Sequence, residues 1–88
     1  MQLVVFTSQS CAPCAQLKRS IEQVTLPDHI DYREIDVEQN PQQAMGYAVR
    51  SLPTIIVTDG DGIPVQTKTG SMSVSALEDF IRGATKGE

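Results

Sequence analysis

The stretch at residues 2–7 (QLVVFT) constrains the fold most strongly, because the positions from Leu3 to Phe6 are all apolar. A strand with one wet face alternates between apolar and polar residues, whereas a strand covered on both faces is apolar throughout. We therefore expect this strand in the middle of a sheet that has other elements packed on both sides. A chain of 88 residues has room for one such core, so we expect a single domain over residues 1–88.

A polar loop and an amphipathic helix follow this strand, and we place the helix at about residues 12–24. Ser10 is available near the helix start, and Pro13 suits a first turn, where backbone amides have no partner within the helix. The apolar residues of the helix recur at spacings of three and four and form one stripe: Cys14, Leu17, Ile21 and Val24.

The rest of the chain continues the alternation of strands and helices. Residues 30–37 mix apolar and charged side chains, as is typical of an edge strand. The segment DGDG at residues 59–62 is a hairpin signal, and Pro64 places the second hairpin strand at a sheet edge. The remaining expected elements are a short helix at about residues 41–47, hairpin strands at residues 54–58 and 63–69, and a last helix from a cap at Ser73 to near Gly83.

The resulting order is βαβαββα, which is an α/β fold. We expect a mixed four-stranded sheet with helices on both faces. A crossover through the helix between the first two strands makes those strands parallel. The hairpin supplies the last two strands and completes the mixed sheet.

Cys11 and Cys14 are the only cysteines, and they lie three residues apart at the start of the first predicted helix. Helical spacing places their Cα atoms within the range of roughly 4.4–6.8 Å that a disulfide needs. Cys14 belongs to the apolar stripe and faces the core, whereas Cys11 is exposed at the helix start. Free amides and the helix dipole favour a thiolate there. We expect Cys11 to attack a partner disulfide and Cys14 to resolve the mixed disulfide.

Other roles for the cysteine pair are less well supported. A zinc site needs two further ligands, and the chain offers only His29 and carboxylates outside any paired motif, so we expect no metal. A purely structural disulfide would close a very short loop and would be reduced in the cytoplasm, the compartment that we expect. The net charge of −4 without a basic cluster argues against nucleic acid, and the apolar runs are too short for a membrane span.

These motifs resemble the thioredoxin superfamily along essentially the whole chain, in a compact form without the extra N-terminal strand and helix of longer members. The motifs are Cys11-Ala12-Pro13-Cys14 at a helix start, Gln39-Asn40-Pro41, Ser51-Leu52-Pro53-Thr54 at the third strand, and Gly70 before the last helix. The resemblance implies a monomeric thiol–disulfide oxidoreductase that reduces protein disulfides and holds no cofactor.

The resemblance also implies a substrate surface and partners. Pro53 would be cis and lie against Cys11, and the Leu52 backbone would pair with the substrate chain. Electrons would come from a flavoprotein disulfide reductase, and ribonucleotide reductase is one candidate recipient. The implied substrate surface is Ser10, Ala12, Pro13, Leu52, Pro53 and Gly70.

Proline immediately before the second cysteine is typical of thioredoxins, whereas glutaredoxins usually place it after the first. Other positions depart from the thioredoxin pattern: Val5 replaces a buried Asp, Glu34 replaces its Lys partner, Ser10 replaces a Trp, and Ala12 replaces a Gly. Two alternatives therefore stay open. One is a glutathione-dependent glutaredoxin, and the other is a non-catalytic redox or metal-binding module that docks a partner.

Overall fold

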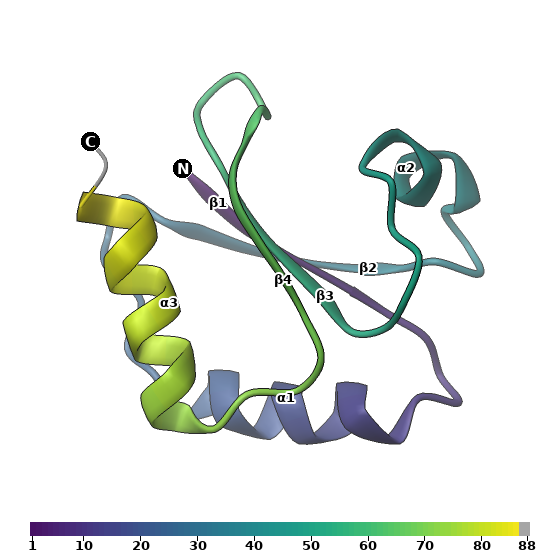
Figure 1. The fold of residues 1–88 in the computed structure, drawn as a ribbon, viewed down its shortest axis with the longest axis horizontal. Helices are drawn as coiled ribbons and strands as arrows, with labels where there is room; N and C mark the ends of the chain where they lie inside the picture. The colour runs from purple at the N-terminus through teal and green to yellow at the C-terminus, as the bar shows by residue number, and fades with distance from the viewer. Residues whose placement is uncertain (87–88) are drawn as a thin grey trace.

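The computed structural model describes residues 1–86, and its elements follow the predicted order (Figure 1). They are β1 (Gln2–Thr7), α1 (Ala12–Glu22), β2 (Asp31–Asp36), α2 (Pro41–Gly46), β3 (Thr54–Thr58), β4 (Pro64–Thr69) and α3 (Val74–Lys86).

The strands form one mixed sheet in the order β2-β1-β3-β4. β1 runs parallel to β2 and antiparallel to β3, and β3 is antiparallel to β4. Residues Leu3 to Phe6 are at most 1% exposed, so the prediction of a central strand buried on both faces is confirmed. The predicted edge positions of β2 and β4 are also confirmed.

Two apolar clusters fill the space on either side of the sheet. Leu3 and Val5 of β1 pack with side chains from α1 and α3, while Val4 and Phe6 pack with Ala44 of α2. Figure 1 shows the same division, with α1 and α3 on one side of the sheet and α2 on the other. The helices therefore cover both faces, as predicted.

The two longer helices end at different residues from those predicted. α1 stops at Glu22 rather than Val24, because the N–H groups of Gln23 and Val24 bond to carbonyls three residues back and tighten the last turn. Val24 still packs against the core. α3 continues past Gly83 to Lys86, and Ala84, which is 1% exposed, anchors that extra turn in the core. A helical glycine costs only about 1 kcal/mol relative to alanine, which this packing offsets.

Four other boundaries move by one residue. β2 begins and ends one residue inside the predicted range, and α2 ends at Gly46 with Tyr47 as its C-cap. β4 begins at Pro64 because both backbone groups of Ile63 bond to Asp59 of the turn.

α2 ends in a Schellman motif that has alanine at the left-handed position. The Val49 N–H donates to the Ala44 carbonyl at 2.9 Å, and the Ala48 N–H donates to the Met45 carbonyl at 3.0 Å. Ala48 has a φ of 56°, a conformation that glycine adopts far more easily than alanine. Gly46, by contrast, lies inside the helix, where a Cβ would meet no atom within 4 Å.

We predict that exchanging these two residues stabilises the protein. Ala48→Gly removes the strain of a left-handed alanine, which is about 1–2 kcal/mol. Part of this gain is offset because glycine has more conformational entropy to lose on folding. Gly46→Ala adds about 0.5–1 kcal/mol of helix propensity. The double variant keeps the composition and should raise the free energy of unfolding by roughly 1 kcal/mol or more in urea denaturation. A matched Ala48→Val variant should be destabilised, and a loss of stability in Ala48→Gly would contradict the prediction.

Candidate active site

Three segments of the chain meet at one end of the sheet. Thr54, at the start of β3, is paired with Phe6 near the end of β1 and with Thr69 at the end of β4. The Gly70 N–H donates to the Pro53 carbonyl at 2.9 Å, which extends this pairing beyond the strands. The loop after β1, the Leu52-Pro53 step and Gly70 therefore share the end of the sheet at which α1 begins.

Cys11 and Cys14 are joined by a disulfide, with a Cα–Cα distance of 5.2 Å inside the predicted range. Cys11 is itself the N-cap of α1, with an extended backbone, and its Sγ accepts a hydrogen bond of 3.2 Å from the Cys14 N–H. Sulfur thus takes the capping role for which Ser10 was available, and Ser10 stays exposed. Cys14 is 1% exposed, as predicted, whereas Cys11 is half-buried rather than exposed, because its Sγ lies against the first turn of α1 and accepts the Cys14 N–H.

The Leu52-Pro53 peptide bond is cis, as the family resemblance implied. Pro53 is buried and Leu52 is half-buried. The Thr54 hydroxyl donates to the Ser51 carbonyl at 2.6 Å and braces the turn at the start of β3. The other members of the predicted surface divide by exposure, since Ala12 and Pro13 are exposed and Gly70 is half-buried.

The loop that contains Gly70 is fastened to α1 by contacts that sequence analysis did not identify. The Ser20 hydroxyl donates to the Met72 carbonyl at 2.7 Å, and the Ser71 hydroxyl lies 3.4 Å from Gln16 Oε1. Met72 is buried in the core, so the loop is held from both sides. Ser20 is a polar residue on a helix face, and the sequence around it does not indicate a hydrogen-bond partner 52 residues away.

The thioredoxin family model matches residues 1–83 of the chain. The chain belongs to the thioredoxin family. It is similar to thioredoxin of Methanocaldococcus jannaschii, with 34% identity over 80 residues that cover 89% of this chain and 93% of that protein. It is also similar to thioredoxin of Streptomyces clavuligerus, with 37% identity over 78 residues, or 85% of this chain and 70% of the relative.

Solved thioredoxin structures have the same fold. A mutant thioredoxin from Halobacterium salinarum superposes with a TM-score of 0.83 and 31% identity, covering 96% of this chain and 74% of that one. Thioredoxin 1 of Thermosipho africanus has a TM-score of 0.80 and covers 98% of this chain and 96% of its own, and its 23% identity supports the fold alone. Family membership and the bonded Cys11–Cys14 pair make this protein a thiol–disulfide oxidoreductase.

The two departures from the thioredoxin family pattern in the sheet are neighbours in space. Val5 is fully buried in the apolar core and is in register with Glu34 of β2. Glu34 lies at the sheet edge, where its Oε1 pairs with Lys18 Nζ of α1 at 2.7 Å and its Oε2 accepts a hydrogen bond of 3.4 Å from the Tyr32 hydroxyl. The sequence did not indicate this ion pair.

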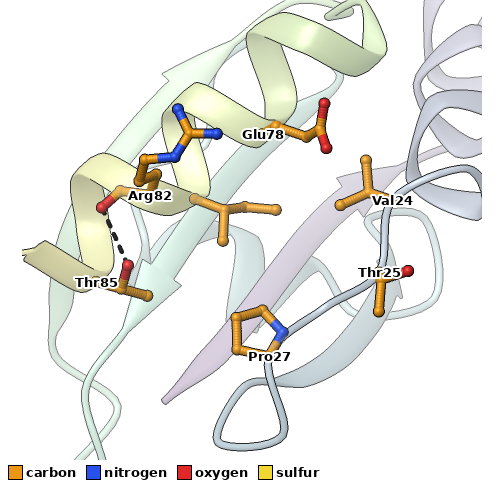
Figure 2. A pocket seen from close by; sticks show the side chains of 7 residues that line it. Val24, Thr25, Pro27, Glu78, Arg82 and Thr85 are labelled. Atoms are coloured by element: carbon orange, nitrogen blue, oxygen red, sulfur yellow. Dashed lines mark hydrogen bonds between the residues drawn. The ribbon is translucent and has the colours of Figure 1, made fainter.

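A cavity of about 220 Å³ lies at the far end of α1 from the disulfide (Figure 2). It is lined by residues that follow α1 and by one face of α3: Val24, Thr25, Pro27, Glu78, Ile81, Arg82 and Thr85. No residue of the predicted active site lines it. Within residues 1–86, no cluster of His, Cys, Asp or Glu is suited to hold a metal ion, and no helix is long and apolar enough to cross a membrane.

We predict that Tyr32 makes the protein less stable at alkaline pH. Burial, and then the charge of Glu34, raises the pKa of Tyr32 from 10.0 to about 12. The folded state therefore holds this proton more tightly than the unfolded state. The stabilisation is complete below pH 10.0 and is lost as the pH rises through about 12.

Urea unfolding at a series of alkaline pH values measures this effect, and the ultraviolet absorbance of tyrosinate reports the ionisation. Tyr32→Phe should show a smaller fall in the free energy of unfolding than the wild type over this range. Equal falls in the two proteins would contradict the assignment.

Proposed function

We propose that the protein is a protein-disulfide reductase in which Cys11 is the nucleophile and Cys14 the resolving thiol. The observation that carries this proposal is the unequal environment of the two sulfurs. Cys11 is half-buried at the helix start, and its Sγ accepts a hydrogen bond from the Cys14 N–H, whereas Cys14 is 1% exposed. A backbone amide and the positive end of the helix dipole favour a thiolate at Cys11.

The reaction exchanges one disulfide for another. The Cys11 thiolate attacks one sulfur of the substrate disulfide, which forms a mixed disulfide and releases the first substrate thiolate. The Cys14 thiolate then attacks Cys11 Sγ, which closes the Cys11–Cys14 disulfide and releases the second substrate thiolate. Two electrons pass from the protein to the substrate. Burial of Cys14 favours this internal attack over attack on other disulfides, because the two cysteines are held 5.2 Å apart at Cα.

The proposed substrate surface surrounds Cys11. Ser10, Ala12 and Pro13 are exposed beside it, and Gly70 and the cis Leu52-Pro53 step lie at the same end of the sheet. The Leu52 backbone makes no hydrogen bond with another residue of the described chain, which supports its proposed pairing with an extended substrate segment. We also propose that Pro53 contacts Cys11 in this surface.

We predict that the two cysteine variants fail in different ways. Cys11→Ser should abolish reduction of insulin disulfides, because no nucleophile remains. Cys14→Ser should lose turnover but accumulate a mixed disulfide with the substrate, which non-reducing electrophoresis and mass spectrometry detect. A matched Ser75→Ala variant, at an exposed position of α3, keeps both thiols and should retain turnover. An inert wild type would support the docking-module alternative, and trapping by Cys11→Ser rather than Cys14→Ser would reverse the assigned roles.

For the electron donor, we propose a flavoprotein disulfide reductase in the cytoplasm, with ribonucleotide reductase among the candidate recipients. We predict that the oxidised protein is reduced rapidly by NADPH with a thioredoxin reductase and slowly by glutathione. Insulin turnover with each donor measures the difference. Rapid turnover with glutathione alone would favour the glutaredoxin alternative.

A further inference from the structure

The Lys18–Glu34 ion pair lies one helical turn from Cys14. Lys18 follows Cys14 by four residues in α1, so it borders the same helix face, and the two Cβ atoms are about 5–6 Å apart. Glu34 reaches Lys18 from the edge strand β2, at a distance of 2.7 Å between Oε1 and Nζ. The two side chains are 40% and 38% exposed, so the pair is only partly screened by water.

Few other charges approach Cys14 from the elements packed around it in the described chain. The central strand β1 brings Val5 to this face, and residues 70–73 before α3 are uncharged. Arg19 of α1 is exposed on another face, whereas Glu22 lies one turn beyond Lys18 and acts by its charge on Tyr32 of β2, which bonds to Glu34. The Lys18–Glu34 pair is therefore the charged pair nearest to Cys14 along α1, with Glu22 one turn farther away.

We propose that Glu34 tunes the redox equilibrium of the cysteine pair by neutralising Lys18. The inference rests on the proposed function, in which Cys14 ionises to resolve the mixed disulfide. Lys18 alone would stabilise a Cys14 thiolate, and Glu34 alone would disfavour it. Together they nearly cancel, and the dithiol form gains little from either. Glu34 is thus a positioning residue, which acts on Cys14 through Lys18.

The equilibrium constant for reduction by glutathione tests this proposal. In this reaction the protein disulfide and two glutathione molecules give the protein dithiol and one glutathione disulfide. At alkaline pH, where the buried Cys14 thiol is ionised, Glu34→Gln should shift the equilibrium constant towards the dithiol by about two- to fivefold, given partial screening. Lys18→Gln should shift it by a similar factor in the opposite direction. The double variant should return close to the wild type. Asp79→Asn, which breaks the exposed Arg82–Asp79 pair on α3, is the matched control and should change nothing.

A second measurement needs no substrate and separates this inference from the proposed reaction. In a Cys11→Ser background, the ultraviolet absorbance of thiolate reports how much Cys14 is ionised at each pH. Glu34→Gln should increase the thiolate fraction at a given pH, and Lys18→Gln should decrease it. A merely structural ion pair would lower the free energy of unfolding in both variants and leave both redox readouts unchanged. Unchanged readouts, or shifts of the same sign, would overturn the inference even if insulin reduction proceeds as proposed.

Discussion

The burial of β1 on both faces is the constraint on which the rest of the structure depends. Burying an aliphatic or aromatic side chain fully contributes about 1.5–3 kcal/mol, and β1 contributes four of them, Leu3 to Phe6. These residues face alternate sides, so both faces of the sheet need a cover. α1 and α3 cover one face and α2 covers the other. The loop after β1 must then begin α1 at the end of the sheet, and this places Cys11 and Cys14 at the same end of the sheet as the start of β3.

The same arrangement makes the two chemically identical thiols unequal. A helix packed by an apolar stripe turns Cys14 into the core, while its first unpaired amides remain near Cys11. The loops that complete the site are held by ordinary contacts, such as the Gly70–Pro53 backbone bond and the Ser20–Met72 bond. The redox pair thus lies on a framework held by the core and by these loop contacts. Val5 and Glu34 depart from the family pattern within this framework, and Glu34 is the residue that we propose to act on Cys14 through Lys18.

Much of the fold and the centre of the site could be predicted from local patterns. Unbroken apolar runs, helical spacing, the DGDG turn and the cap at Ser73 are all encoded within a few residues, and each predicted element is present. The cis Pro53 was predicted from family resemblance, because most X-Pro bonds are trans. The predicted end of α1 was wrong because the N–H groups of Gln23 and Val24 bond to carbonyls three residues back, and that of α3 because burial of Ala84 carries the helix past Gly83. Ala48 in a left-handed conformation contradicts its own preference, so no local pattern could indicate it.

By itself, the sequence determined the order of the elements, the central place of β1 and the burial of Cys14 in the core. These features follow from hydrophobic periodicity, which acts over one or two helical turns. Only the tertiary structure decided which distant polar groups meet, including Lys18 with Glu34, Ser20 with Met72 and Tyr47 with the Gly62 carbonyl. A charged or hydroxyl side chain is compatible with many partners in the sequence. Its actual partner depends on how the helices and strands pack, which the shared hydrophobic core sets.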